Sequence, residues 1–478
     1  MPAINESLLD RRLAALEARR TWSPRLVSKL EHFLREAPDR ALFRINPLSF
    51  AAERGLAEDE TIDLFLYATA EGLFQMNWML LCPICSGVVQ SFQQLNSVEK
   101  QYYCYPCQAG FEAKLDEFIA VTFTVDREVR DIVFHHPDQL SPRDFFFEYC
   151  ASSEGCLPDG TPFVRMQEAV TRELVHLPPG EVTRVELDVG ECRLAGISHQ
   201  GGIALFFDVT GEPAKAPQQF DLTFDERVDR YDTRTVAPGR IVLAIRNVRP
   251  ERGTLLIATL PPGYEPSLQH LAFRPFVSGK RLLTSQTFRT LFRTEVIGGS
   301  GGLGISDIAL LFTDLKGSTQ LYERIGDLNA FNLVQQHFDR LQEITVHHHG
   351  AIIKTIGDAV MAAFLEPADA VRAALAMRRD IATLRPGEGD RDLILKIGIH
   401  KGAAIAVTLN DRLDYFGQTV NIASRVQELA DADDIYLSEA VFAVPAVKAA
   451  LAELPVETRS TTLRGIVEEQ RVYRVGAA

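Results

Sequence analysis

The apolar residues of the first hundred positions recur at the spacing of an amphipathic helix. Two such series predict helices around residues 8–16 and 62–73. Residues 49–74 have the outline of a helix-turn-helix with its turn at Gly55. Four of the six residues 58–63, at the start of its second helix, are acidic. A helix that reads a DNA groove needs positive charge, so we interpret this unit as a packing element.

Short apolar runs separated by Gly, Pro and Asp clusters replace this pattern between residues 118 and 262. They predict a β-rich domain, either a sandwich or a barrel. Within it, the apolar runs 240–248 and 254–260 flank the sequence Arg249 to Gly253. Such a polar break between two apolar runs predicts a hairpin.

Residues 281–297 return to near-helical spacing, and four glycines then break the chain. Beyond this boundary, segments of strand and helix type alternate. Residues 350–364 predict a hairpin turning at Gly357, and residues 393–400 and 403–409 predict two further strands. The order β, α, β, β, α, β is typical of a ferredoxin-like fold, here with extra elements appended.

The composition is that of a folded protein of several domains. The 478 residues are 46% hydrophobic and 24% charged, close to the average of globular chains. Lys and Arg number 50 against 64 Asp and Glu, and the net charge of -14 disfavours nucleic-acid binding. Neither an apolar run of membrane-spanning length nor an apolar block at the start is present in the sequence. We therefore expect a cytoplasmic protein with no membrane span.

Four of the seven cysteines form two CxxC pairs, Cys82 with Cys85 and Cys104 with Cys107. The 18 residues between the pairs fall within the spacing of a four-thiolate zinc site. Four protein ligands leave no position for water, so we predict one structural Zn²⁺ per chain. Four unconnected buried cysteines are the alternative. The intervening segment has a single Lys, which favours a scaffold or partner role over nucleic-acid binding.

Two carboxylates in the last third of the chain are candidate metal ligands. Asp314 closes the apolar strand 308–314, and Asp358 lies in the predicted hairpin turn. In a ferredoxin-like sheet both can reach one edge of the same surface. Two carboxylates beside a nucleotide phosphate suit a two-metal centre, although exposed Asp residues also end strands and occupy turns.

Polar groups that suit phosphate follow in the sequence. Asn421 and Arg425 are four residues apart and so share one face of a predicted helix, where they could stabilise a pentavalent phosphate; a solvated helix face is the alternative. A polar turn after Asp314 opens a helix, and its free N–H groups can hold phosphate oxygens unless it is an ordinary capping turn. The turn residues proposed to bind substrate are Leu315, Gly317, Ser318 and Thr319.

Four blocks of the C-terminal part resemble the signature blocks of the class III nucleotidyl cyclases in order and spacing. They are FTDLKGSTQL, IIKTIGDAVMAAF, LKIGIH and LDYFGQTVNIASRV, and the similarity covers residues 306–478. The resemblance implies a ferredoxin-like catalytic domain that converts a nucleoside triphosphate to its 3′,5′-cyclic monophosphate and pyrophosphate. It also implies two Mg²⁺ or Mn²⁺ ions per site and a head-to-tail homodimer. The preceding residues resemble the amino-terminal regulatory region of some bacterial cyclases.

The resemblance also implies a role for each matching residue. The metal ligands would be Asp314 and Asp358, the base-selecting pair Lys354 and Asp414, the transition-state pair Asn421 and Arg425, and the late phosphate contact Arg464. One position departs from the pattern, because Ala403 stands where some members have a phosphate-binding Arg. Lys401 is a candidate substitute.

The base-selecting pair favours ATP. Adenine presents an acceptor at N1 and a donor at N6, which match the Lys354 ammonium and the Asp414 carboxylate. We therefore expect an adenylate cyclase. A guanylate cyclase and a catalytically silent nucleotide-sensing or zinc-ribbon interaction protein are the alternatives.

Together these patterns divide the chain into four parts within a multi-domain α+β protein. They are a helical region over 1–117 with a zinc ribbon at 82–107, a β-rich regulatory domain over 118–280, a linker helix and Gly-rich hinge over 281–305, and the catalytic domain over 306–478. We expect the N-terminal domains to receive a regulatory protein or a small ligand.

Overall fold

The structure is a computed structural model that forms two compact units. The first contains residues 1–93, 99–113 and 118–277, and the second contains residues 94–98, 114–117 and 278–478. The predicted division into four parts stays a prediction, and the main boundary between the units lies at 277/278. The residues that the structure describes are 4–107, 109–200, 204–225, 232–264, 271–298, 301–316, 323, 326–381, 394–431, 433–466 and 468–476.

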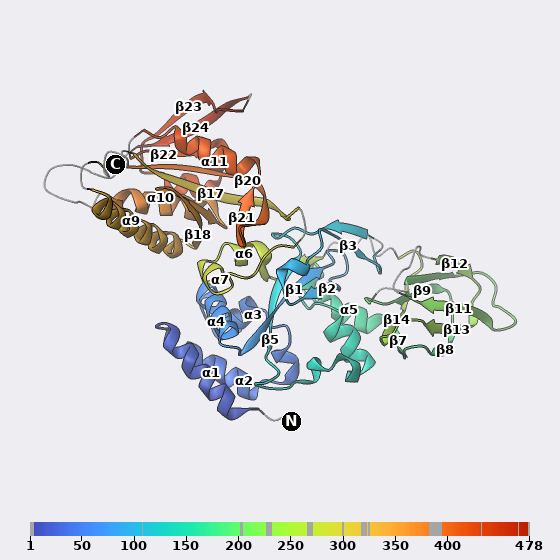
Figure 1. Cartoon of the computed structure of the whole chain (residues 1–478). Helices are drawn as coiled ribbons and strands as arrows, with labels where there is room; N and C mark the ends of the chain where they lie inside the picture. Colours follow the sequence, from blue (N-terminus) through green and yellow to red (C-terminus); the bar gives the residue numbers. More distant parts are fainter. Residues whose placement is uncertain are drawn as a thin grey trace. The chain divides into compact units, whose positions relative to one another are not determined.

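The first unit begins with four helices whose apolar faces are buried. They are α1 (Glu6–Arg19), α2 (Leu26–Glu36), α3 (Pro47–Arg54) and α4 (Glu58–Ala70) (Figure 1). Asn46 caps α3, and α3 ends at Gly55, whose φ of 62° is one that glycine adopts without strain. The predicted helix, Gly55 turn and helix are therefore confirmed. Phe65 of α4 is fully buried, as a packing element requires.

Strands β1 (Phe74–Leu81), β2 (Val88–Phe92), β5 (Ile119–Val125) and β16 (Val277–Ser278) form a sheet in the order β16-β5-β1-β2. A separate hairpin, β3 (Gln101–Cys104) with β4 (Ala109–Glu112), follows β2 in the chain. Its flanking segments 94–98 and 114–117 belong to the second unit.

The β-rich part packs two sheets around one core. The first sheet has the order β12-β10-β9-β14-β7 and the second the order β11-β13-β8. Their bounds are β7 (Thr171–Leu177), β8 (Val182–Val189), β9 (Cys192–Ile197), β10 (Ala204–Val209), β11 (Gln218–Phe224), β12 (Asp232–Val236), β13 (Gly239–Asn247) and β14 (Gly253–Leu260).

The hairpin predicted around Arg249 is wrong, because β13 and β14 lie in different sheets. The chain crosses between the sheets at this point. Asn247 holds the crossing: its Nδ2 donates to the carbonyls of Leu177 and Glu251 at 2.9 Å, and its Oδ1 accepts from the N–H of Arg249. Two apolar runs around a polar break thus mark two strands without specifying that they pair.

The second unit is built on one large sheet of order β18-β19-β17-β20-β22-β24-β23, with β21 paired to β20. The hairpin predicted over residues 350–364 is confirmed by the antiparallel pairing of β18 with β19. The two strands predicted at 393–400 and 403–409 are one continuous strand, β20. The strands are β17 (Leu303–Lys316), β18 (Gly350–Ile356), β19 (Ala359–Phe364), β20 (Ile394–Leu409), β21 (Arg412–Phe416), β22 (Ile435–Ser438), β23 (Val456–Thr462) and β24 (Glu469–Val475).

Helices cover both faces of this sheet. The main core joins α9 (Asp327–His347) and α10 (Pro367–Ile381), which pack side by side, to one face (Figure 1). A smaller core joins α11 (Gln418–Glu428) to the other face. A Cβ at Gly398 of β20 would lie 2.2 Å from the main-chain nitrogen of Gln427, so this glycine lets α11 approach the strand closely. The unit is thus a mixed α/β domain, and its ferredoxin-like topology stays a prediction.

The segment before the sheet forms two short helices, α6 (Gly279–Leu283) and α7 (Gln286–Leu291). The hydroxyls of Ser278 and Ser285 cap them, which explains why one helical pattern becomes two helices. Phe288 of α7 is fully buried. Helix α7 therefore packs within the second unit.

Within the described residues no helix is long and apolar enough to cross a membrane.

Candidate functional site

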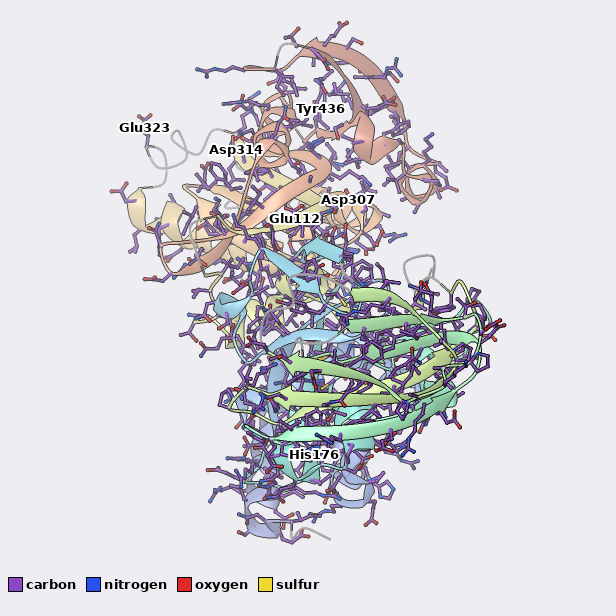
Figure 2. The ribbon with its side chains drawn as sticks, turned by 90° about the vertical axis from the view of Figure 1, so that its right-hand side faces the viewer. Glu112, His176, Asp307, Asp314, Glu323 and Tyr436 are labelled. Atoms are coloured by element: carbon purple, nitrogen blue, oxygen red, sulfur yellow. The ribbon has the colours of Figure 1, made fainter. Side chains whose placement is uncertain are left out.

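Asp314 and Asp358 lie at the same end of adjacent strands. The antiparallel register of β17 and β19 pairs Thr313 with Val360, so Asp314 at the end of β17 approaches Asp358 in the turn before β19. The Thr313 hydroxyl accepts from the N–H of Val360 at 3.2 Å and fixes this register. Figure 2 labels Asp314 and Asp307, which lie toward opposite ends of β17.

The electrostatics of this pair suit a cation. Partial burial and the charge of Asp358 raise the pKa of Asp314, while Lys396 counteracts them. Oδ2 of Asp358 is buried and has no hydrogen-bond partner among the described residues. Two carboxylates that repel each other, one with an unused oxygen, fit the hard oxygen-ligated cations Mg²⁺ and Mn²⁺.

Lys354 and Asp414 form a direct ion pair. The Lys354 Nζ lies 2.6 Å from Oδ2 of Asp414, and the second carboxylate oxygen accepts from the N–H of Tyr415 at 2.8 Å. The side chain of Lys354 is 36% exposed and that of Asp414 is 11% exposed. The two residues come from β18 and β21, 60 positions apart, and the fold brings them together as a matched donor and acceptor.

Asn421 and Arg425 lie on α11, as the sequence predicts. The Thr419 hydroxyl donates to the carbonyl of Ala403 and ties the first turn of α11 to β20. Asn421 is exposed, and the half-buried Arg425 forms an ion pair with Glu428 one turn later. In the described part of the chain, neither residue forms a hydrogen bond or ion pair with the two aspartates or with the Lys354–Asp414 pair.

The remaining sequence candidates have different outcomes. Arg464 is exposed and follows β23. Leu315 lies in β17 with its side chain in the core, because the strand runs to Lys316 and the turn does not begin at 315. Lys401 pairs with Asp307 at 2.8 Å. Gly317, Ser318 and Thr319 lie outside the described residues.

The four paired cysteines gather into one cluster in the first unit. Their sulfurs all lie within 4.8 Å of one another, with 3.8 Å between Cys82 and Cys107 and 3.6 Å between Cys85 and Cys104. A tetrahedron of Zn–S bonds of about 2.3 Å has sulfurs about 3.8 Å apart, so the residues fit a zinc ion. The N–H of Ile84 points at the Cys82 sulfur at 3.4 Å, which suits a thiolate.

Two residues near the site were not singled out from the sequence. Lys396 is the cross-strand partner of Asp314 in the register of β17 and β20. Buried His337 of α9 feels the charge of Asp358, and burial lowers its pKa to about 4. The alternation of apolar residues in β20 marks Lys396 as outward-facing, but only the register places it beside Asp314.

Two family models match two separate parts of the chain. A family model described as "Adenylate and Guanylate cyclase catalytic domain" matches residues 304–470, and the "Family of unknown function (DUF5939)" matches residues 9–290. Putative adenylate cyclase 3 of Rhizobium meliloti is 28% identical over 134 residues, which are 28% of this chain and 22% of that protein. The adenylate cyclase of Lachancea kluyveri is 30% identical over 152 residues, 28% of this chain and 8% of that protein. This chain therefore spans less than a quarter of either relative.

Solved cyclase structures are similar to about a third of this chain. The adenylyl cyclase CyaB of P. aeruginosa is 21% identical with a TM-score of 0.32, covering 36% of this chain and 95% of that one. The guanylate cyclase domain of RhGC from Catenaria anguillulae is 20% identical with a TM-score of 0.33, covering 36% and 98%. From the family matches, the chain belongs to the family of unknown function DUF5939 through residues 9–290, and its C-terminal part is a class III adenylate and guanylate cyclase catalytic domain.

Proposed function

We propose that the chain is an adenylate cyclase that converts ATP to 3′,5′-cyclic AMP and pyrophosphate. The observation that carries the choice of ATP is the Lys354–Asp414 pair at 2.6 Å. An ammonium can donate to N1 of adenine while a carboxylate accepts from its N6 amino group. Guanine presents a donor at N1, which faces the Lys354 ammonium unfavourably.

The residues of the second unit divide the reaction between them. Asp314 and Asp358 hold the divalent ions, which supply Lewis-acid stabilisation of the phosphate oxygens when bound. Asn421 and Arg425 donate to the oxygens of the α-phosphate, where charge develops. The 3′-oxygen forms a bond to the α-phosphorus and loses its proton, and the bond from that phosphorus to the pyrophosphate oxygen breaks. Arg464 contacts the triphosphate.

We propose that two copies share each site in a head-to-tail homodimer. In a single chain, no hydrogen bond or ion pair joins the metal-binding aspartates to Asn421 and Arg425 among the described residues. Large apolar side chains lie exposed at the end of β18 and on the β20–β21 hairpin: Ile356 at 52%, Ile405 at 41%, Leu409 at 47% and Phe416 at 65%. Ile405 and Phe416 are cross-strand partners, so they form a patch that suits a second copy.

The first unit would regulate this activity in the cytoplasm. The cysteine cluster would hold one structural Zn²⁺, and a protein or small ligand would act on the N-terminal domains. The hairpin that carries Cys104 and Cys107 is flanked on both sides by segments of the second unit, which supports a regulatory connection. Within the second unit, the segment 114–117 is held to β17, because the carboxylate of Asp116 accepts from the N–H groups of Ser306 and Asp307 at 2.8 and 3.1 Å.

The test is the initial rate of purified full-length protein with ATP and with GTP, each with Mg²⁺ and with Mn²⁺. We expect cyclic AMP formation with ATP as the preferred substrate. Preference for GTP would support the guanylate alternative. Nucleotide binding without a cyclic product would support the silent nucleotide-sensing alternative.

A further inference from the structure

Arg289 of α7 contacts the main chain next to both base-selecting residues. Its guanidinium donates to the carbonyl of Leu413 at 2.5 Å and, at the longer distance of 3.5 Å, to the carbonyl of Ile353. Leu413 directly precedes Asp414, and Ile353 directly precedes Lys354. Both carbonyls accept from the same nitrogen, Nη2, so this one side chain connects the two strands that supply the pair.

The irregularity of β18 explains why these groups are available. β18 is an edge strand of the sheet, and its register with β19 shifts between Ile352 and Lys354. Such a bulge leaves main-chain groups outside the ladder. Helix α7 satisfies them, because Oε1 of Gln286 accepts from the N–H of Ile352 at 2.9 Å while Arg289 donates to the next carbonyl.

Helix α7 is itself held firmly against this edge. The Ser285 hydroxyl caps it, and Phe288 is fully buried and stacks on Phe292 with ring centres 5.4 Å apart. Further along the chain, the N–H of Ile297 donates to the Thr408 hydroxyl of β20 at 2.8 Å. Contacts before and after α7 in the chain therefore hold Arg289 in place.

We infer that Arg289 is a positioning residue for base recognition: it sets the separation of Lys354 and Asp414 through the carbonyls that precede them. The inference rests on the proposed function, because it assigns the pair to the adenine base. A displacement of about 1 Å in a bound substrate can cost on the order of 100-fold in rate. Any movement of α7 relative to β18 and β21 would change the geometry of the base contacts while leaving the metal-binding aspartates in place.

Truncating Arg289 should leave the fold intact. A cavity of about 270 Å³ beside α7 is lined by Arg289, Ile353, Leu413 and the exposed Arg293 among others. Water can therefore reach the two carbonyls once the guanidinium is removed. Arg289→Ala removes both contacts, and Arg289→Lys keeps the positive charge but removes the nitrogen Nη2 from which both carbonyls accept. Arg293→Ala is the matched control in the same segment.

The experiment measures kcat and KM for ATP and GTP with the full-length variants, together with the affinity for a non-hydrolysable ATP analogue by calorimetry. We expect Arg289→Ala to raise KM for ATP and to lower the affinity for the analogue, each by about tenfold or more. The variant should also have a lower ratio of kcat/KM for ATP to kcat/KM for GTP, and its dependence on metal concentration should be unchanged. Arg289→Lys should lie between wild type and Arg289→Ala, and Arg293→Ala should match wild type.

A loss confined to kcat, equal for ATP and GTP and with unchanged analogue affinity, would overturn the inference and make Arg289 a structural residue only. Thermal unfolding of each variant separates this result from loss of the fold. Failure of the proposed function has a different signature, because wild-type protein would then lack ATP turnover before any variant is compared.

Discussion

Replacing Lys354 with Met tests the base-selecting pair, because Met keeps the apolar stem and removes the ammonium. The side chain of Asp414 is 11% exposed, and the N–H of Tyr415 would then be its one remaining hydrogen-bond partner among the described residues, with the charge of Arg289 nearby. Removing one member of an exposed pair costs about 0–1 kcal/mol, and of a fully buried pair about 3–5 kcal/mol. Lys354 is 36% exposed, so we expect a loss of about 1–2 kcal/mol in the free energy of unfolding.

The effect on catalysis should be larger for one nucleotide than for the other. Without its donor, N1 of adenine is left unpaired in the site, and we expect kcat/KM for ATP to fall about 100-fold, which is about 2.7 kcal/mol. GTP turnover should fall by less than about tenfold, because guanine presents no acceptor at N1.

The assay compares initial rates of cyclic AMP and cyclic GMP formation over a range of nucleotide concentrations, with chemical denaturation of the same preparations. Lys448→Met, an exposed substitution on α13 (Pro445–Ala450), is the control and should change neither quantity. An equal fall for ATP and GTP that parallels the loss of stability would refute the reasoning and make Lys354 a structural residue.

Three further predictions address the other sites. Asp314→Ala and Arg425→Ala should each be nearly inactive alone. An equimolar mixture with exchanged subunits should regain about a quarter of wild-type activity, because half of the dimers are then heterodimers and each of these has one intact site of two. Verified heterodimers without activity would contradict the shared site. Metal analysis should find about one zinc per chain, and replacing Cys82 and Cys85 by Ser should remove it. The rate of cyclic nucleotide formation by the full-length protein should then change, without a change in the ATP-to-GTP preference. Burial lowers the pKa of His337 to about 4 from the ordinary 6.5. As the pH falls between these values, the imidazole takes up a proton in the unfolded chain while it stays neutral in the folded chain, and this favours unfolding. Over that window His337 should contribute a fall of about 3 kcal/mol to the free energy of unfolding, and His337→Gln should remove this component. Identical pH dependence of the two proteins in urea titrations would argue against it.

The sequence by itself determined the features that depend on near neighbours. Apolar spacing predicted helices α3 and α4 around Gly55 and the β18–β19 hairpin, because a turn and two adjacent strands need no distant partner. The CxxC spacing likewise brought four cysteines into one predicted cluster. The order of motifs in the C-terminal part identified a cyclase catalytic domain, and the family match over residues 304–470 supports it.

Tertiary structure decided which strands pair and which side chains meet. The apolar runs around Arg249 marked two strands correctly, but Asn247 directs the chain from one sheet to the other, and no local pattern encodes that crossing. Lys396 lies beside Asp314 only through the β17–β20 register. Arg289 reaches the carbonyl of Leu413 from 124 positions away, because a bulge on an edge strand leaves room for a helix that the sequence marks only as a linker. Contacts of this kind depend on the packing of several elements together, and the hydrophobic pattern of any one element cannot specify them.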